Sequence, residues 1–464
     1  MASVRHPLDA RLLDVLPVGS VFAVGGRVRD EFRGRLEGVT FPPKDLDYVV
    51  TGLAFAELEV RLAEIGRVDL VGASFAVVKL TAPEGQADIA LPRREQSTGV
   101  GHSAFTVESG PAVSLEDDLG RRDFRMNMIA RELGSDRIVD PHDGVRDVAA
   151  RRIDIVTARA FEDDPLRMLR AAQFAARFDF EVSAEVRRAM SAAAALVTTV
   201  SAERVGEELA KLFVLAKRPS VGLELLRETD VLAQLWPEML EGVGVDQNEW
   251  HAYDVYRHNL VTLDATPPGD LVLRLAALLH DVGKPRTKDG PHFYRHEHVG
   301  ADMVPAMLAR LRLSTETVTT VARLVRQHMY TADPELQPKA LRRFVQRVGR
   351  EHLGRLFALR AADVLGSGLP KRSDENERFE ARVAAIVAEA PPFAITDLAI
   401  SGSDVIGLLV QAGRVPADFL GDRRVGAVLR ALFEFVTDDP RRNVRTTLLA
   451  EAMRSIEEGA AQGD

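Results

Sequence analysis

The first 150 residues alternate short apolar runs with turns rich in glycine and proline. Four of these runs resemble strands: VFAVGG at 21–26, LDYVVTG at 46–52, FAVVKL at 75–80 and ADIAL at 87–91. Each is short and rich in β-branched or aromatic side chains, as strands are. One segment, near 54–66, has the apolar spacing of a helix. The pattern predicts an α/β head in which a single helix accompanies several strands.

From about residue 160 onward the apolar residues recur at intervals of three and four, which is the period of an amphipathic helix. DPLRMLRAAQFAARF (164–178) and PAMLARLRLSTETVTTVARLVRQHM (305–329) show this most clearly. Proline, glycine and charge interrupt the pattern at 236–247, 366–377 and 389–393. We therefore expect an α+β protein, with an α/β head followed by an all-helical body. The expected division is 1–150, 151–240, 241–375 and 376–464.

Composition narrows the class of protein. The 464 residues are too many for one hydrophobic core. A hydrophobic fraction of 46% with 28% charged residues is ordinary for a globular protein. No apolar run approaches the ~18–20 residues of a membrane span, and the N-terminal stretch lacks the uninterrupted apolar region of a secretory signal. We expect a cytoplasmic protein with no membrane partner.

Charge and cysteine content limit the chemistry. Because the chain has no cysteine, only histidine, aspartate and glutamate remain as strong metal ligands. The net charge of −9 means that the surface as a whole does not attract nucleic acid. Any contact with RNA must use a local basic surface.

The stretch KDLDYVV (44–50) carries the first candidate site. On a strand, Asp45 and Asp47 share one face because side chains alternate. Paired carboxylates at this spacing suit Mg²⁺ and phosphoryl transfer, although D-x-D alone also fits a solvated polar face. The glycine pair Gly25-Gly26 directly after an apolar run favours the first interpretation, because glycine lets backbone N–H groups approach a phosphate. Arg29 adds a planar fork of donors.

Together with LEDDLGRRDFRMNMIA (115–130), these stretches resemble the class II tRNA nucleotidyltransferase and bacterial poly(A) polymerase family. That family carries G-G-x-V-R-D, D-x-D and R-R-D-F-T-x-N-A-x-A in this order. The resemblance implies a polymerase β-like nucleotidyltransferase head in which Asp45 and Asp47 are catalytic and hold Mg²⁺. It further implies nucleotide-binding roles for Gly25, Gly26, Arg29, Arg122, Asp123 and Asn127.

Two positions in this head depart from the family, and the role of a third residue stays open. Arg125 replaces the family's threonine and Met128 its alanine, so packing is expected to differ there. Asp88, in ADIAL, is either a further carboxylate near the metals or a solvated strand residue.

A second candidate site lies in FEDDPLRMLRAAQFAARF (161–178). The residues predict a helix start, with Asp164 as N-cap and Pro165 in the first turn. Arg167 and Arg170 lie on the same helical face as Asp164, which places an acceptor beside donors. Such a pair matches the amino group and ring nitrogen that cytosine and adenine share, and it rejects uracil and guanine.

In the same family, the motif E-D-P-L-R-x-L-R-x-x-R-F-A occupies this position. The resemblance assigns base recognition to Asp164 and Arg167, and it assigns nucleotide contacts to Arg170 and to the position that Gln173 occupies. Two residues depart from it: Asp163 replaces glutamate, and Gln173 replaces the third arginine.

The segment REQSTGVGHSAFTVESGPAVS (94–114) bears on which nucleotides are added. It is about as long as the flexible loop of complete CCA-adding members, whereas members that add only CC lack part of this loop. A CC-only activity is therefore not expected. A-adding and poly(A) enzymes keep the loop and stay open as alternatives.

A third candidate site surrounds LRLAALLHDVGK (273–284). Histidines and carboxylates from several helices can hold a divalent metal that activates a water molecule. The order of the surrounding motifs resembles the HD phosphohydrolase superfamily, and some tRNA nucleotidyltransferases carry such a domain with cyclic phosphodiesterase or phosphatase activity. The alternative is that these residues are a structural remnant of such a site and do not form an active metal site. The implied metal residues are His258, His280, Asp281 and Asp363, with His298 and His328 as candidates for a second ion or a phosphate.

The sequence thus predicts a template-independent enzyme that adds C and A to tRNA 3′ ends. With the resemblance, the four regions become a nucleotidyltransferase head, a neck that recognises base and RNA, an HD domain and a tRNA-binding helical tail. Its expected partners are tRNA, ATP and CTP, and its oligomeric state stays open. The alternatives are an A-adding or poly(A) enzyme and an HD phosphohydrolase with a nucleotide-binding head. A non-catalytic RNA-binding protein is the weakest, since binding alone needs no paired carboxylates.

Overall fold

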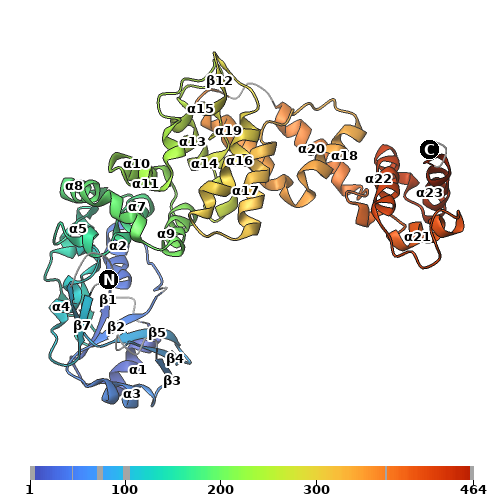
Figure 1. The fold of residues 1–464 in the computed structure, drawn as a ribbon. Coiled ribbons are helices and arrows are strands. Elements are labelled where there is room, and N and C mark those ends of the chain that lie inside the picture. The colour runs from blue at the N-terminus through green and yellow to red at the C-terminus, as the bar shows by residue number, and fades with distance from the viewer. Residues whose placement is uncertain (1–5, 44, 71–76, 98–104, 371–373, 460–464) are drawn as a thin grey trace. The chain divides into compact units, whose positions relative to one another are not determined.

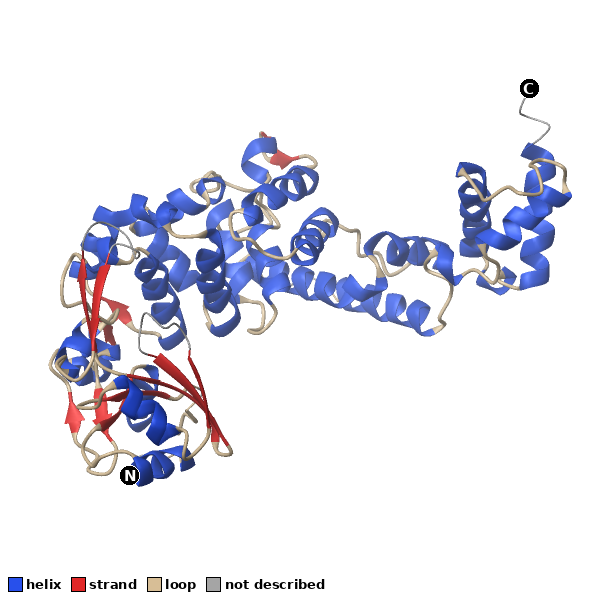
Figure 2. Cartoon of the chain, turned by 60° about the horizontal axis from the view of Figure 1, so that its bottom comes forward, coloured by secondary structure: helices blue, strands red, loops and turns tan. Residues whose placement is uncertain are grey.

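The computed structural model describes residues 6–43, 45–70, 77–97, 105–370 and 374–459. The chain divides into two compact units, each built from three segments. The first comprises Met1–Glu241, Pro267–Arg274 and Met307–Leu313, and the second comprises Gly242–Thr266, Leu275–Ala306 and Ser314–Asp464. Figure 1 shows the order of the elements along the chain, and Figure 2 shows that the long strands belong to the N-terminal part.

Among the described residues, seven strands form the main sheet of the head: β1 (Val21–Val24), β2 (Asp47–Val50), β3 (Arg67–Leu70), β4 (Val77–Ala82), β5 (Gly85–Ala90), β8 (Ala130–Glu132) and β9 (Ile138–Val139). Their order is β3-β4-β5-β2-β1-β8-β9. Strands β2 and β5 pair in parallel, with Asp47 opposite Asp88, and the other pairs are antiparallel. The predicted strand runs correspond to β1, β2, β4 and β5. A separate hairpin pairs β6 (Arg93–Ser97) with β7 (Phe105–Ser109).

The prediction of a single helix in the head is wrong. Near the predicted segment 54–66 the structure has α3 (Phe55–Leu62), and other helices accompany it: α1 (Pro7–Val15), α2 (Gly26–Glu37), α4 (Leu115–Gly120) and α5 (Gly144–Ala149). Helix α2 escaped the apolar pattern because arginines occupy three of its five buried positions, which are Arg27, Val28, Arg29, Arg33 and Gly34. Burial of arginine, which apolar periodicity does not register, explains the miss.

A buried ion pair fixes α2 against α1 and the sheet. Arg27 donates to both carboxylate oxygens of Asp9, at 2.8 and 2.5 Å. The hydroxyl of Tyr48 donates to Asp9 at 2.6 Å, and Arg27 also donates to that hydroxyl at 2.8 Å. Burial alone would raise the pKa of Asp9, but its contacts with Arg27 hold that pKa below its usual value. The network therefore keeps Asp9 ionised inside the head.

Replacing Asp9 with alanine is expected to lower the free energy of unfolding of the head by about 3–5 kcal/mol. It removes the carboxylate that holds the buried guanidinium of Arg27 through two hydrogen bonds and leaves only the longer pair with Glu31, at 3.5 Å. Urea unfolding and hydrogen exchange of the β1 amides measure this loss. The matched control is Asp14→Ala on the same helix, where the side chain is 64% exposed. Equal unfolding midpoints for the two variants would contradict the assigned role of the network.

Helices continue the first unit beyond the head. They are α6 (Ala160–Asp163), α7 (Leu166–Phe178), α8 (Ala184–Ala193), α9 (Ala202–Leu215), α10 (Ser220–Glu228), α11 (Val231–Leu235) and α12 (Pro237–Leu240), with the short pair β10 (Arg152–Ile153) and β11 (Glu181–Val182). Two later segments complete this core. Trp236 Nε1 donates to the carbonyl of Met307 at 3.1 Å, and buried Arg274 donates to the carbonyl of Ala216 at 2.6 Å.

The second unit is helical apart from the short hairpin β12 (Lys288–Asp289) and β13 (His292–Phe293). Its helices are α13 (Val255–Asp264), α14 (Leu271–Leu279, whose first residues belong to the first unit), α15 (Lys284–Thr287), α16 (His296–Ala309), α17 (Thr315–Gln327), α18 (Pro338–Val348), α19 (Leu353–Gly366), α20 (Glu375–Ala388), α21 (Gly402–Gln411), α22 (Arg423–Asp438) and α23 (Arg445–Gly459). The last three helices pack around their own apolar cluster, which includes Val405, Leu432 and Leu448. No helix among the described residues combines the length and apolar character of a membrane span.

Candidate active site and metal centre

A pocket of about 750 Å³ opens where β1 ends and α2 begins. Gly25 links the two elements with φ +70°, and α2 begins at Gly26. A Cβ at Gly25 would lie 3.0 Å from Nη1 of Arg122 and 3.8 Å from Oδ2 of Asp47. The glycine therefore permits both the turn and the close approach of these two side chains.

Replacing Gly25 with alanine is expected to lower kcat/KM for the nucleotide addition that the sequence predicts by about 10²-fold, because the Cβ strains the turn and displaces Arg122. Steady-state kinetics measure the effect. Gly38→Ala is the matched control: it ends the same helix at φ +68°, but an added Cβ meets nothing within 4 Å. If both variants lose the same activity, the cause is backbone strain rather than the crowded pocket.

Asp45 and Asp47 both line this pocket, while Leu46 and Tyr48 are buried in the head. Burial raises the pKa of Asp47, Arg122 opposes the rise, and the charges of Asp88 and Asp45 add to it. The negative charges of Asp45, Asp47 and Asp88 thus act on one another, and the positive charge of Arg122 offsets them only in part. This oxygen donor set fits a hard divalent cation.

Hydrogen bonds connect most of the predicted nucleotide-binding side chains of the head, and Arg122 has a separate partner. Arg29 donates to Oδ1 of Asn127 at 2.7 Å, and Asn127 donates to Asp123 at 2.8 Å. Arg170 donates to the other oxygen of Asp123 at 2.8 Å. Arg122 donates to buried Asp118 at 3.2 Å. Asp123 does not line the pocket but holds Asn127 and Arg170, which do.

Where Arg125 replaces the family's threonine, it forms its own ion pairs. It contacts Asp147 at 2.8 Å and Asp154 at 2.7 Å. These two carboxylates are buried. Arg125, which departs from the family, is therefore held by ion pairs with carboxylates that do not line the pocket.

The start of α7 differs from the predicted one by one residue. Pro165 is the N-cap, and Asp164 instead accepts from the backbone N–H of Leu166 at 3.3 Å. Its carboxylate also pairs with Arg204 at 3.3 Å. Arg167 donates to the carbonyl of Arg121 at 2.7 Å. Neither Asp164 nor Arg167 lines the pocket, whereas Arg170 and Gln173 from the next turns do.

Several pocket residues escaped the sequence analysis. Arg33 follows Arg29 by one helical turn, and Arg177 follows Gln173 by one turn, so continuing the helical period from the predicted residues finds both. The pocket is lined by Gly25, Gly26, Arg29, Asp45, Asp47, Arg122, Asn127, Arg170 and Gln173 from the predicted set, and also by Arg33, Phe41, Phe174, Arg177, Phe178, Glu208 and Lys211. Part of the loop at 94–114, residues 98–104, lies outside the described residues.

A second site, in the other unit, gathers histidines and carboxylates from several helices. His258 comes from α13, His280 and Asp281 follow α14, His296 begins α16, His328 ends α17, and Asp363 lies in α19. Two groups of these side chains lie close enough together to hold a metal ion: His258, His280 and Asp363, and Asp281, His296 and His328. The two oxygens of Asp281 lie against different histidines. Oδ2 is 3.4 Å from His258 and 3.3 Å from His280, and Oδ1 is 3.1 Å from His296 and 3.5 Å from His328.

Backbone carbonyls orient three of the four imidazoles of this cluster. The Nδ1 atoms of His280, His296 and His328 lie 2.8, 2.7 and 2.7 Å from the carbonyls of Ala277, Phe293 and Val325, respectively. A proton on Nδ1 leaves the lone pair of Nε2 facing the cluster, as in metal-binding histidines. The donor set therefore fits divalent metal ions.

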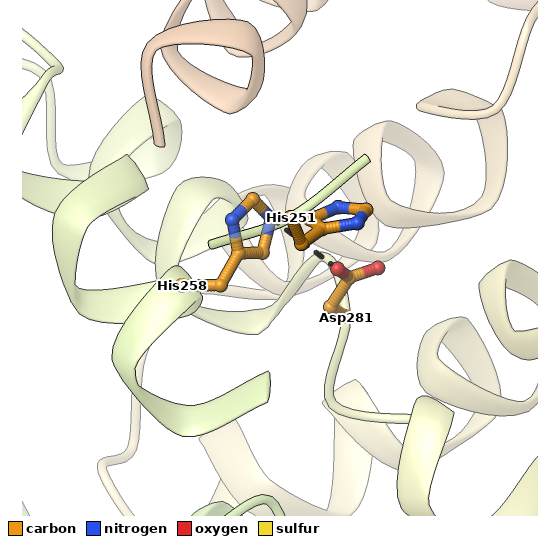
Figure 3. A group of neighbouring side chains, drawn as sticks. All are labelled: His251, His258 and Asp281. Carbon is orange, nitrogen blue, oxygen red and sulfur yellow. Dashed lines mark ion pairs between the residues drawn. The ribbon is translucent and has the colours of Figure 1, made fainter. Parts of the chain in front are cut away.

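The placement of His298 differs from the expectation. Its imidazole contacts Glu297 at 2.8 Å and is 42% exposed, outside the cluster. His296, two residues earlier on α16, faces the carboxylate of Asp281 instead. Figure 3 shows a third group that the sequence analysis did not assign, in which His251 lies beside His258 and Asp281. Lys284 also approaches Asp281, at 2.5 Å.

Comparison with known proteins places the chain in a family. Residues 21–154 match the poly A polymerase head domain, 179–242 match the probable RNA and SrmB-binding site of polymerase A, and 262–367 match the HD domain. A protein of Cupriavidus taiwanensis named multifunctional CCA protein is 39% identical over 322 residues, which cover 66% of this chain and 74% of that protein. The chain belongs to the tRNA nucleotidyltransferase and poly(A) polymerase family. A protein of the same name from Verminephrobacter eiseniae is 36% identical, over 73% of this chain and 81% of that protein.

The fold of this nucleotidyltransferase matches a solved member of the family. The CCA-adding enzyme of Bacillus stearothermophilus, solved in complex with CTP, aligns with a TM-score of 0.66 at 22% identity. The alignment covers 96% of this chain and 95% of the other. The predicted α+β protein, with an α/β head followed by a helical body with an HD domain, is thus confirmed.

Proposed function

We propose that this nucleotidyltransferase adds C and A to the 3′ ends of tRNA, using CTP and ATP without a nucleic-acid template. The observation that carries the proposal is the pocket itself, in which paired carboxylates face a glycine turn and a helix start lined with arginines. The family supports it, because relatives that share over a third of their aligned residues with this chain are named multifunctional CCA proteins. The proposed compartment is the cytoplasm, where ATP, CTP and tRNA are all available.

In the proposed reaction, the 3′ hydroxyl of the tRNA attacks the α-phosphorus of the nucleotide and pyrophosphate leaves. Asp45 and Asp47 would hold Mg²⁺, which neutralises phosphate charge and favours ionisation of the attacking hydroxyl. The N–H groups at the start of α2, with Arg29 and Arg122, then orient the phosphates for in-line displacement. Asn127 holds Arg29 from one side, so that its guanidinium is fixed before the nucleotide binds.

Base selection is proposed to lie on α7. The family assigns this role to the residues that match Asp164 and Arg167. In the present structure Asp164 pairs with Arg204 and Arg167 with the carbonyl of Arg121. To read a base, this pair must exchange those contacts for the amino group and ring nitrogen of cytosine or adenine. Arg170 and Gln173 already face the pocket.

Three tRNAs, ending before CCA, after C and after CC, test the proposal. Each is incubated with enzyme and Mg²⁺ and with CTP, ATP or both, and products are resolved at single-nucleotide length. We expect complete CCA on the shortest tRNA when both nucleotides are present. Extension of only the CC-ended tRNA by ATP would instead identify an A-adding enzyme, long A tracts would identify a poly(A) polymerase, and no extension would contradict the proposal.

We propose a second activity, metal-dependent phosphohydrolysis, at the cluster around Asp281. The supporting observation is the convergence of four imidazoles and two carboxylates. Three of the histidines, His280, His296 and His328, are oriented through Nδ1. A bound divalent ion would supply an activated water molecule. Lys284 and His251, at the edge of the cluster, offer donors for a phosphate group. Cyclic phosphates or phosphate monoesters at damaged RNA ends are the proposed substrates.

A further inference from the structure

Three guanidinium groups surround one aromatic ring in the nucleotidyltransferase pocket. Arg29, Arg33 and Arg177 lie 4.5, 4.3 and 5.1 Å from the ring centroid of Phe178. The first two come from α2 and the third from α7. All four side chains line the pocket of about 750 Å³.

The charges of this group do not balance. Asp30 accepts from Arg29 at 3.0 Å and from Arg33 at 3.0 Å, and Glu37 pairs with Arg33 at 3.3 Å. Among the described residues, no carboxylate lies within ion-pairing distance of Arg177. Arg177 thus has no direct ion pair, and the charges of Asp30 and Asp45 act on it only from a longer distance. Burial and the neighbouring charges of Arg29 and Arg33 lower the pKa of Arg177, the direction expected where an anion is missing.

The location of this surplus charge indicates which anion it serves. Arg29 lies in the first turn of α2, whose N-terminus attracts anions. The carboxylate of Asp45 is close enough to act electrostatically on Arg177. Because Asp45 is a proposed metal ligand, a nucleotide whose phosphates bind that metal brings those phosphates toward Arg177.

We propose that Arg177 binds a phosphate of the incoming nucleotide and of the departing pyrophosphate, in addition to the residues that the family motifs identify. The inference rests on the proposed nucleotidyltransferase function and deepens it. Gln173, where the family has an arginine, is uncharged and lines the pocket one turn earlier on α7. Arg177 therefore supplies a positive charge on the helix face where Gln173 replaces an arginine of the family.

Kinetics of Arg177→Gln and Arg177→Lys test the assignment, with Arg188→Gln, an exposed arginine on α8, as the control. We expect the glutamine variant to raise the KM for both CTP and ATP by about tenfold, since one charge-assisted phosphate contact is lost. The lysine variant should raise it by about threefold, because an ammonium keeps the charge but not the planar fork. The KM for tRNA and the melting temperature should stay the same.

Pyrophosphate, titrated calorimetrically in the presence of Mg²⁺, gives a measurement that needs no turnover. Its Kd should rise in Arg177→Gln by the same factor as the nucleotide KM. A raised KM for tRNA with unchanged nucleotide KM would overturn the inference and assign Arg177 to a primer phosphate. If the KM values and the pyrophosphate Kd are all unchanged, the inference is wrong and Arg177 only packs on Phe178. If the wild type extends no tRNA, the proposed function fails, yet the pyrophosphate titration still decides the inference. Should the glutamine variant not fold, an unchanged nucleotide KM or pyrophosphate Kd in the lysine variant overturns it.

Discussion

Replacing either Asp45 or Asp47 with asparagine is expected to lower the rate of nucleotide addition by at least about 10³-fold, because each change removes a ligand charge from the proposed metal site. Binding of tRNA should persist, since the change removes negative charge from a pocket that faces RNA phosphates. Single-turnover addition of A to a CC-ended tRNA measures the first quantity, and filter binding measures the second.

Asp69→Asn is the matched control for these variants. Asp69 lies on β3 of the same sheet, pairs with Arg67 and is 46% exposed. It should keep wild-type activity. Retention of more than a tenth of the activity in both Asp45 and Asp47 variants would exclude the head as the catalytic site.

Removing the carboxylate of Asp281 is expected to have the largest effect in the second unit. Its two oxygens face two histidine pairs, so Asp281→Asn should weaken metal binding in both groups by at least about 100-fold. His328→Ala should weaken only the group with His296, because His258, His280 and Asp363 keep their arrangement. Metal content after dialysis, measured by mass spectrometry, checks both expectations without reference to activity.

Hydrolysis of a 2′,3′-cyclic phosphate then connects the metal to the proposed second activity. It should disappear in Asp281→Asn, while CCA addition stays at the wild-type rate. His298→Ala is the matched control, because this exposed histidine lies on the same helix as His296 but outside the cluster. Unaltered hydrolysis in Asp281→Asn would show that the cluster is a structural remnant.

Local sequence pattern predicted much of the head because strand composition and side-chain alternation are short-range properties. Asp45 and Asp47 both line the pocket, although the predicted strand placement holds only for Asp47, because β2 begins there and Asp45 lies in the bend before it. The same reasoning missed α2, whose buried face carries arginines instead of apolar side chains. The groups that stabilise those arginines are distant in sequence: Asp9 lies 18 residues before Arg27, and Asn127 lies 98 residues after Arg29.

The histidines show a second limit of sequence reasoning. The motifs contain both His296 and His298, two residues apart on one helix, but only His298 was assigned to the site. Only the packing of α16 against its neighbours decides which of the two faces Asp281. Similarly, the roles expected of Asp164 and Arg167 depend on contacts with Arg204 and with a carbonyl of the head, which no local pattern contains.

The interleaving of the two compact units constrains how such an enzyme arises and changes. The chain completes the first unit only with Pro267–Arg274 and Met307–Leu313, which are embedded in the HD region. A gene fragment ending at residue 241 would leave Trp236 without the carbonyl of Met307. It would also leave the carbonyl of Ala216 without Arg274. A break at that junction would therefore remove contacts of the first unit, and point substitutions are the cleaner way to separate the two proposed activities.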